Sequence, residues 1–488
     1  MRINHLRSVA RVFARLLIIF AGTMLLPLAA SWLLDDGAQF AYDEGVLITL
    51  LCGLALWWWT RRHRGELQIK DGFLLVVMTW TLLPAFATLP LVIYFWPDLS
   101  FTDAYFETVS GITTTGATVL VGLDKLPYSI NLWRAELVWL GGMGLIVLAV
   151  AILPLLGVGG RQMFKAEAPG PMKESKLTPR MAETAKGLWL IYVGISVACF
   201  VAMKWAGMSW GDALVHTFTV MGLGGFSTHD ASFGYFNSVR IEAVTIVFMT
   251  LAGMNFATHF LAWRSRALSP YRWDPEIRWF LVVMYASVLG VAVYLWAMDT
   301  YENFPEALRY AAFNTVSIAT TTGFANTDYS QWPLFAPLWM LFLSSFVTCS
   351  GSTGGGIKMA RAMILYKQVL RELVRSVHPN AVIPIKFGAE VVPHNIVFAV
   401  LAFGFSYMVV LVSLTLILSF TGLDIVTAFS AVVACVNNTG PGLNQVGPAT
   451  TFAILTDFQT WTCSMAMLLG RLEIFTLLVV LSPAFWRK

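Results

Sequence analysis

The chain contains the sequence FETVSGITTTG at residues 106–116 and the sequence FNTVSIATTTG at residues 313–323. Eight of these eleven positions are identical, which indicates that the two segments are copies of one unit. Two more segments follow the same plan, an apolar stretch and then a polar turn with glycine, and their turns are GLGGF at 222–226 and NNTGP at 437–441. The final glycines of the four segments are residues 116, 225, 323 and 440. The spacing predicts four diverged copies of one structural unit.

The composition excludes a soluble globular protein. Of the 488 residues, 57% are hydrophobic and only 12% are charged, against roughly a quarter charged in soluble domains. Stretches that reach or nearly reach the ~20 apolar residues needed to cross a bilayer occur at 16–34, 46–59, 73–95, 133–156, 188–205, 241–263, 279–296, 333–348, 357–370, 396–418 and 461–481. We interpret the first as a retained helix rather than a signal peptide, because it is long and many spans follow it. The five cysteines show no metal-ligand spacing.

Lysine and arginine are segregated along the chain. They cluster at 2–15, 61–70, 161–186, 264–272, 367–375 and 487–488, whereas segments 97–132, 205–239, 299–332 and 421–459 carry twelve acidic residues and two basic ones. Because short basic loops stay on the cytoplasmic side, we expect both termini to be cytoplasmic and the four acidic segments to face outside. The net charge of +4 is too small to suggest a nucleic-acid partner.

Each acidic segment is longer than a simple connection and opens with an apolar stretch that is too short to span, which indicates a re-entrant helix. Non-helical backbone at membrane depth must be buried or line a watery cavity, so we expect the four turns to meet around one axis. The predicted fold is an all-α polytopic membrane protein with four membrane-pore-membrane repeats around one pore, preceded by two extra transmembrane helices. The expected divisions are 1–70 for those two helices, then 71–160, 161–270, 271–380 and 381–488 for the repeats.

The four turns have the chemistry of a cation site. Glycine adopts backbone angles that let consecutive carbonyl oxygens point inward and replace the water shell of a cation. The C-terminal ends of short helices carry partial negative charge, and an acidic vestibule concentrates cations. One glycine alone would more simply be a helix-ending turn residue, but four at matching positions favour a filter. The candidate ion-binding residues are Thr114, Thr115, Gly116, Leu223, Gly224, Gly225, Thr321, Thr322, Gly323, Asn438, Thr439 and Gly440.

Other polar residues near these segments have simpler interpretations. Asp103, Asp212, Glu306 and Asp424 lie near the starts of the predicted pore helices, where we expect them to cap the helix. His216 and His229 are interpreted as structural residues rather than ligands.

The sequences TTTG at 113–116, GLGGFS at 222–227, ATTTGFANTD at 319–328 and NNTGPGLN at 437–444 resemble the TrkH/TrkG-type membrane subunit of bacterial Trk potassium-uptake systems, within the Trk/Ktr/HKT superfamily. The resemblance covers essentially the whole chain. It implies potassium as the permeant ion, no organic cofactor, residence in the lipid of the bacterial inner membrane, a homodimer with one pore per protomer, and gating by a cytoplasmic nucleotide-binding protein of the TrkA type. Repeat two departs from the threonine pattern, so that only backbone carbonyls can act there.

A second stretch, TCSGSTGGG at residues 348–356, interrupts an apolar segment after the third filter. It lacks the Gly-Lys-Ser/Thr ending of a phosphate-binding loop, and no strand precedes it. We interpret it as an intramembrane loop, which the resemblance makes a gate closed against a buried arginine. The alternative is a structural role for that arginine, in an ion pair with Glu473 or another buried acid. The gate residues are Ser350, Gly351, Gly354, Gly355, Gly356, Lys358 and Arg471.

Other functions fit the sequence less well. A proton-coupled symporter usually needs an acidic residue in mid-membrane, and apart from Glu473 the acids lie near the ends of the predicted spans. An enzyme would need a nucleophile–base pair or a metal cluster, and none is apparent. A sodium-conducting or weakly selective member of the same superfamily is the nearest alternative. Because the chain has no nucleotide-binding fingerprint and its inner face is basic around 161–186 and 358–375, we expect a soluble regulatory protein to dock there.

Overall fold

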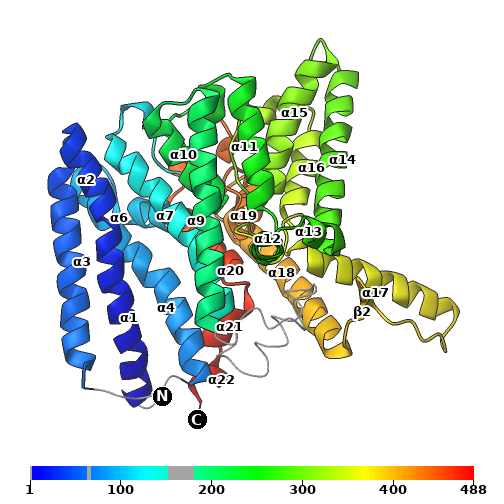
Figure 1. Cartoon of the computed structure of the whole chain (residues 1–488), viewed down its shortest axis with the longest axis horizontal. Helices are drawn as coiled ribbons and strands as arrows, with labels where there is room; N and C mark the ends of the chain where they lie inside the picture. The colour runs from blue at the N-terminus through cyan, green and yellow to red at the C-terminus, as the bar shows by residue number, and fades with distance from the viewer. Residues whose placement is uncertain (1–2, 63–67, 152–180, 488) are drawn as a thin grey trace.

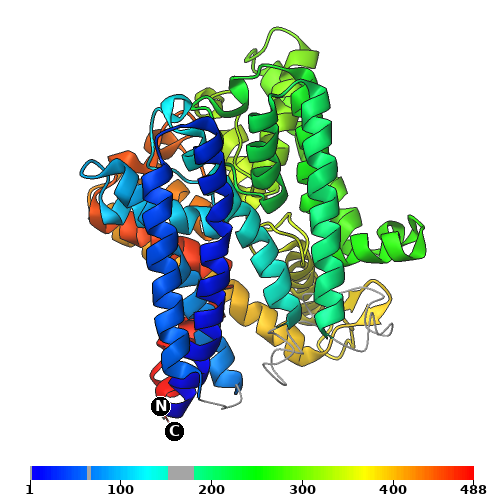
Figure 2. The same ribbon diagram turned by 60° about the vertical axis from the view of Figure 1, so that its left-hand side comes forward.

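The computed structural model of the chain describes residues 3–62, 68–151 and 181–487, and within these ranges the fold is almost entirely helical (Figure 1). The first unit consists of α1 (Ile3–Thr23), α2 (Leu25–Leu34) and α3 (Gln39–Thr60). Figure 2 shows α1 and α3 side by side, in front of the rest of the molecule. Both ends of the chain lie at the same end of the molecule (Figure 1).

The four repeats follow in order. Repeat one contains α4 (Ile69–Ala87), α5 (Leu89–Phe95), α6 (Phe101–Ile112), η1 (Leu123–Lys125) and α7 (Tyr128–Ala151). Repeat two contains α9 (Met181–Ala206), α10 (Trp210–Gly222), η3 (Ser232–Gly234), α11 (Val239–Ala252), α12 (Phe256–Ser265) and α13 (Ser269–Trp273). Repeat three contains α14 (Pro275–Ala297), α15 (Phe304–Ala319), η4 (Tyr329–Gln331), α16 (Phe335–Ser344) and α17 (Met359–Val377). Repeat four contains α18 (His394–Phe420), α19 (Ile425–Val436), η5 (Asn444–Val446), η6 (Phe452–Ile454), α20 (Asp457–Arg471), α21 (Phe475–Leu481) and α22 (Pro483–Trp486).

A two-residue hairpin joins repeats three and four. Its strands, β1 (Lys386–Phe387) and β2 (Glu390–Val391), pair antiparallel and form the only sheet in the described ranges, with Lys386 opposite Val391. Ile385 and Phe387 pack with Ile364 of α17 and Val397 of α18 in a small core of their own. The hairpin therefore ties the end of repeat three to the first helix of repeat four.

The described residues form six helices that are long and apolar enough to cross a membrane, or up to eight if each bent pair is one span. The chain is thus an all-α, multi-pass membrane protein. The predicted span at 133–156 belongs to α7, and its last residues lie outside the described ranges, as does the proposed boundary at 160. Most of the basic segment 161–186 lies outside them too.

In repeats two, three and four, the helix that follows the pore helix is broken. The predicted span 241–263 is two helices, α11 and α12, bent by 93°, and the span 461–481 is α20 and α21, bent by 113°. In repeat three, α16 ends after ten residues and an extended loop separates it from α17. The breaks in repeats three and four lie beside the end of α19, because a Cβ on Gly355 or Gly470 would meet the main-chain oxygens of Asn437 or Val436.

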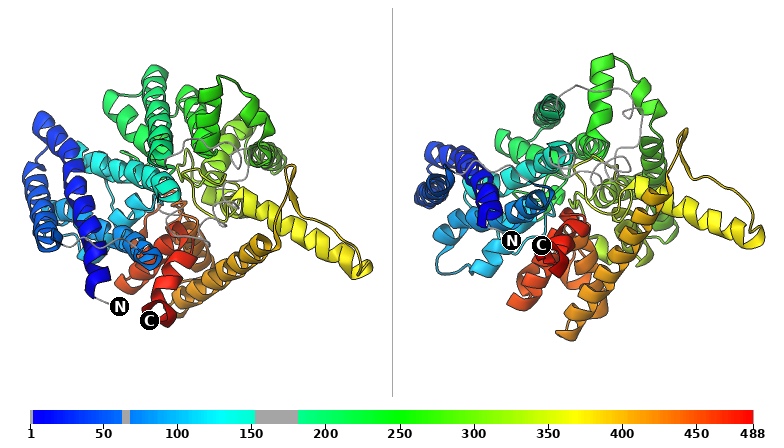
Figure 3. Two further views of the ribbon diagram at one scale, coloured as in Figure 1. Left: turned by 60° about the horizontal axis from the view of Figure 1, so that its bottom comes forward. Right: turned by 90° about the horizontal axis from the view of Figure 1, so that it is seen from below.

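The prediction of a span at 357–370 was wrong. This stretch is the beginning of α17, an amphipathic helix that projects from the body of the molecule (Figures 1 and 3). Its apolar residues at helical spacing were mistaken for a continuous apolar run, although Arg361 and Lys367 interrupt them. Its exposed apolar residues are Tyr366, Val369, Leu370, Leu373, Val374 and Val377.

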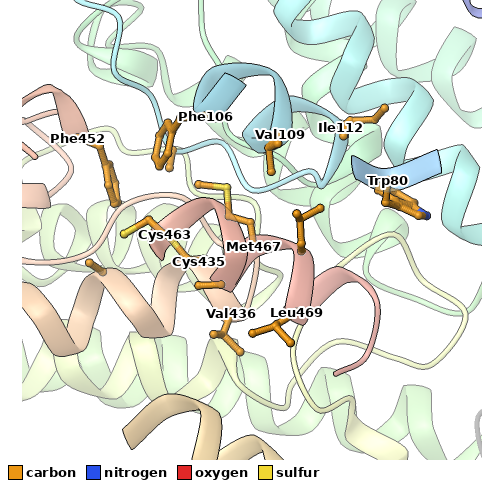
Figure 4. Packing of buried hydrophobic residues seen from close by; sticks show 14 of the residues in the cluster. Trp80, Phe106, Val109, Ile112, Cys435, Val436, Phe452, Cys463, Met467 and Leu469 are labelled. Atoms are coloured by element: carbon orange, nitrogen blue, oxygen red, sulfur yellow. The ribbon is translucent and has the colours of Figure 1, made fainter. Parts of the chain in front are cut away.

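The pore helix of repeat one packs in the main core. Figure 4 shows Phe106, Val109 and Ile112 of α6 close to Met467 and Leu469 of α20, with Trp80 of α4 beside them. Because lipid tails are as apolar as these side chains, such contacts stabilise the fold through close packing rather than through removal of surface from water. This packing holds the last turn of α6 in place.

Candidate ion pathway

The four pore helices are α6, α10, α15 and α19, and each begins with a side-chain cap. The capping residues, whose side chains accept main-chain N–H groups of the first turn, are Ser100, Ser209, Asn303 and Asp424. Of the four acids predicted as caps, only Asp424 caps directly. Asp103 and Asp212 instead accept a hydrogen bond from the hydroxyl of the capping serine, at 2.8 and 2.7 Å. The acids therefore support the caps from the third helical position.

All four pore helices end in the same turn. A residue in the left-handed conformation stands two positions before each predicted filter glycine, with φ of 56°, 56°, 61° and 53° at Thr114, Leu223, Thr321 and Asn438. The N–H of the next residue donates to the carbonyl five residues earlier, at 2.8–3.0 Å, and the N–H of the left-handed residue donates to the carbonyl three earlier. This is the Schellman helix ending. Repeat two has it as well, although its sequence differs.

The four turns meet in a closed ring. A Cβ atom on Gly116 would lie 2.5 Å from the Gly225 nitrogen, and one on Gly225 would lie 2.7 Å from the Thr322 oxygen. A Cβ on Gly323, where φ is +91°, would lie 2.0 Å from the Thr439 oxygen. A Cβ on Gly440 would lie 2.8 Å from the Thr115 oxygen, which closes the ring. Each glycine thus faces the backbone of the next repeat, and a side chain there would push two repeats apart.

Several side-chain hydroxyls of the turns form hydrogen bonds with other side chains of the turns. Thr115 bonds Thr113, and Thr322 bonds Thr320, each at 2.8 Å between hydroxyl oxygens. The Asn438 amide donates to the Thr115 hydroxyl at 3.0 Å and so joins repeats four and one. Thr114 Oγ1 and Thr439 Oγ1 are buried and have no hydrogen-bond partner among the described residues. The atoms left for a ligand are therefore oxygens, which suits an alkali cation.

The predicted gate loop lies directly against the ends of three pore helices. The Thr353 hydroxyl donates to the Met221 carbonyl at 3.0 Å, and the Gly355 N–H donates to Thr321 Oγ1 at 2.9 Å. A Cβ on Gly355 would lie 2.0 Å from the Asn437 oxygen. Ser350 and Gly351 lie farther out along the same loop, where the Gly351 carbonyl accepts the Phe256 N–H at 3.1 Å.

The carboxylate of Glu276 anchors both ends of this loop. Its Oε1 accepts the N–H of Ser350 at 2.6 Å and the N–H of Ala360 at 3.0 Å, and the residue is fully buried. No local pattern singles Glu276 out, because an acid after Asp274 and Pro275 is ordinary at a helix start. Its partners are main-chain groups more than 70 residues away.

Arg471 is the last residue of α20, at the bend before α21, and is 2% exposed. Its guanidinium donates to the Thr353 carbonyl at 2.8 Å and to the Gly141 carbonyl at 2.9 Å. The ion pair considered for Arg471 and Glu473 is not formed; Glu473 pairs with Arg361 of α17 at 2.7 Å instead. The Lys358 ammonium donates to the Gly354 carbonyl. Two buried cations thus hold carbonyl groups of the loop.

Beyond the second filter turn, His229 lies between two acids from different repeats. Its Nδ1 contacts Asp124 of η1 at 2.5 Å, its Nε2 lies 3.4 Å from Asp212, and its ring stacks on Tyr235. Burial alone would lower the pKa of His229, but the neighbouring carboxylates of Asp212 and Asp124 raise it above its ordinary value of 6.5. His216 bonds the Ser227 hydroxyl at 2.9 Å. The described residues contain no group of three or more His, Cys, Asp or Glu that could hold a metal ion.

Known proteins resemble this chain over its whole length. The family model described as the TrkH cation transport protein matches residues 39–488. The chain belongs to the TrkH family. It is 47% identical to the Trk system potassium uptake protein TrkH of Salmonella typhimurium, over 99% of this chain and 100% of that protein. It is 36% identical to TrkG of Escherichia coli, over the full length of both.

A solved relative has the same fold. The crystal structure of the potassium transporter TrkH from Vibrio parahaemolyticus matches with a TM-score of 0.91 at 45% identity, covering 99% of this chain and 100% of that one. The TrkH family is a family of transporters and not of enzymes.

The His229 cluster predicts a pH-dependent stability. A group whose pKa is raised by folding stabilises the protein fully below its unfolded pKa and loses that contribution as the pH rises through the folded pKa. We therefore expect His229→Gln to lower the melting temperature in detergent at pH 6 by a few degrees, and by less at pH 9. His378→Gln, at an exposed position after α17, is the control. An equal effect of His229→Gln at both pH values would contradict the ion-pair assignment.

Proposed function

We propose that this protein takes up potassium ions through a pore whose filter is the ring of four turns. The observation that carries the proposal is the ring itself: four helix endings of one geometry, with a glycine in each pressed against the next repeat. Carbonyl rings of this kind replace the hydration shell of a cation. The relatives are named as Trk potassium uptake proteins, which supports potassium as the ion.

The filter works through the main chain. The four pore helices aim their carbonyl ends at the ring, so that their partial negative charge favours a cation there. The carbonyls that follow the left-handed residues in each turn form the coordinating layers, and the glycines permit their orientation. Because Leu223 and Gly224 offer no side-chain oxygen, repeat two contributes carbonyl groups alone. A sodium-conducting or weakly selective pore is the alternative for the same ring.

We propose that the loop from Ser350 to Gly356 is the gate. It lies against the pore-helix ends, and Arg471 places a positive charge beside it. A cation would meet both the loop and this charge on the pathway. The Gly-rich sequence and the Glu276 anchors at its two ends suit a segment that can be displaced as a unit when α17 moves, because α17 begins directly after it.

The charge distribution and the exposed surfaces suggest how the protein is oriented and what binds to it. We place the protein in the bacterial inner membrane with both termini cytoplasmic, on the basis of the lysine and arginine segregation. The exposed apolar face of α17 suits a second copy of this chain, because a projecting helix with six such residues needs a covering surface. A soluble regulatory protein would then dock on the basic inner face. In the stretch 358–375, Lys358, Arg361 and Arg371 are buried, so its positive surface charge comes from Lys367 and Arg375.

One observation favours a proton-coupled mechanism, which the sequence had disfavoured. Glu136 lies inside α7 rather than near the end of a span, is 6% exposed, and its Oε2 has no hydrogen-bond partner among the described residues. However, Arg134, Leu137 and Val138 mark the side of α7 that faces the pore helices, and helical spacing puts Glu136 on the other side. The channel-like mechanism therefore remains the proposal.

Gly116→Ser tests the filter. At φ +84° and with the Gly225 nitrogen 2.5 Å from the new Cβ, the serine must displace the second turn. We expect the ratio of K+ to Na+ flux into proteoliposomes to fall about tenfold, or by ~1.4 kcal/mol of discrimination. Gly122→Ser is the matched control, because Gly122 has φ +70° but no neighbour within 4 Å. An unchanged flux ratio in Gly116→Ser would exclude this ring as the filter.

Arg471→Ala tests the gate. Without the guanidinium, the Thr353 carbonyl loses its donor and the positive barrier disappears, so K+ flux in the absence of any regulatory protein should rise several-fold. The K+ to Na+ ratio should stay near that of the parent. Deletion of several residues between Ser350 and Gly356 should act in the same direction. Arg278→Ala, at an exposed position on α14, is the control. If both gate variants keep the low parental flux, the loop is a structural kink.

The mass of the purified complex tests the proposed dimer and the proposed soluble partner. Native mass spectrometry of the protein purified from its source cell should give a dimer, together with a soluble nucleotide-binding protein. Leu373→Glu on the exposed face of α17 should yield monomers that still fold. A monomeric parent would contradict the proposed contact, and nucleotide-dependent flux by the isolated chain would contradict the need for a soluble partner.

A further inference from the structure

In each repeat, a side chain in the middle of the pore helix forms a hydrogen bond with the segment that follows the filter glycine. We call this bond the tie of the repeat, and the residues that form it differ among the four repeats. In repeats two and three the residue nine positions before the filter glycine makes the tie: His216 bonds the Ser227 hydroxyl at 2.9 Å, and the Asn314 amide donates to Asn326 at 2.6 Å. In repeat four the Ser430 hydroxyl accepts the N–H of Leu443 at 2.9 Å. These are neutral hydrogen bonds within one repeat.

Repeat one uses a charged tie. Glu107, nine positions before Gly116, accepts the Val119 N–H at 3.0 Å and the Thr118 hydroxyl at 2.9 and 3.0 Å. It also accepts the Arg134 Nε at 2.7 Å. Glu107 and Arg134 are each 1% exposed. The carboxylate is thereby saturated by donors from the filter exit and from α7.

The Arg134 guanidinium also contacts residues of the second repeat. Its Nη2 donates to the Thr118 hydroxyl at 3.1 Å, and its Nη1 donates to the Asn131 side chain at 2.9 Å and to the Ser227 carbonyl at 3.3 Å. Its plane also lies over the Phe226 ring, 4.2 Å from the centroid. Phe226 and Ser227 directly follow Gly225, so one cation touches the exits of both the first and the second filter turn.

We propose that Arg134 is a positioning residue for the ion pathway, which fixes the spacing between the first and second filter turns and thereby the preference for K+ over Na+. The inference rests on the proposed function of the four turns as the filter. A planar guanidinium donates along several directions that are fixed in one plane, whereas the three donors of an ammonium rotate about a flexible stem. The two turns touch at Gly116 and Gly225, so a change in the distance between their exits changes the ring directly.

A buried ion pair is by itself weak evidence of a role, because an apolar pair often serves stability equally well. The experiment must therefore separate stability from positioning. The double variant E107Q/R134M leaves no unpaired charge, and its glutamine still offers an acceptor to the Val119 N–H. We expect its melting temperature to stay close to that of the parent, while the K+ to Na+ flux ratio in proteoliposomes falls about tenfold, the effect of losing one charge-assisted hydrogen bond.

The matched control is E242Q/R309M. Glu242 and Arg309 form an ion pair of the same length, 2.7 Å, between α11 and the start of α15, and the pair contacts none of the filter turns. The control should keep the parental ratio. If E107Q/R134M folds and also keeps it, Arg134 is only a structural residue and the proposal is overturned.

Two further variants keep the outcome decisive. Should E107Q/R134M fail to fold, R134K retains the charge without the forked geometry, and a parental flux ratio in R134K would overturn the proposal. Gly116→Ser, measured in parallel, separates the two levels of inference. A lower ratio in Gly116→Ser with a parental ratio in the Arg134 variants would reject the positioning role alone, whereas parental ratios in all of them would reject the filter assignment as well.

Discussion

A chain that leaves helical structure inside a bilayer must find a partner for every N–H and carbonyl group, because no water is available in the hydrocarbon. This constraint determines the centre of the molecule. The four pore helices end there with Schellman turns, which satisfy the first carbonyls from within each turn. Most carbonyls beyond the left-handed residues have no such partner inside the turn; in repeat two the Gly224 carbonyl accepts the Phe226 N–H at 2.8 Å. They are concentrated in a ring where a cation is the natural partner.

The same constraint explains the residues below the ring. The breaks in the helices that follow the pore helices expose further backbone groups, and those of the loop between α16 and α17 are matched by buried charge. Glu276 accepts N–H groups of the loop, while Lys358 and Arg471 donate to its carbonyls. If this loop is the gate that we propose, its closed state is held by a few strong hydrogen bonds rather than by a large packed surface. Such a gate can therefore open without unfolding the helices on either side.

The sequence reveals the part of this design that depends on backbone geometry. Glycine is required where φ is positive and the next repeat is within contact distance. The occurrence of TTTG in two repeats was enough to align the other two. Leu223 carries no such signal, since its left-handed conformation is imposed by the helix ending around it. Long-range partners were out of reach for a different reason. The bend after Arg471 turns Glu473 toward Arg361, and neither the bend nor the role of Glu276 follows from local pattern. The amphipathic α17 was mistaken for a span because its exposed apolar face resembles a membrane helix in composition.

Locating the permeating ion tests directly whether it is held within the ring of four turns. Crystals grown with Rb+ in place of K+, measured at the rubidium absorption edge, locate the ion without reference to the protein. The account predicts anomalous density on the axis of the ring, surrounded by the carbonyls next to Gly116, Gly225, Gly323 and Gly440. Rubidium density elsewhere, at side-chain carboxylates or between other helices, with none inside the ring, would contradict it.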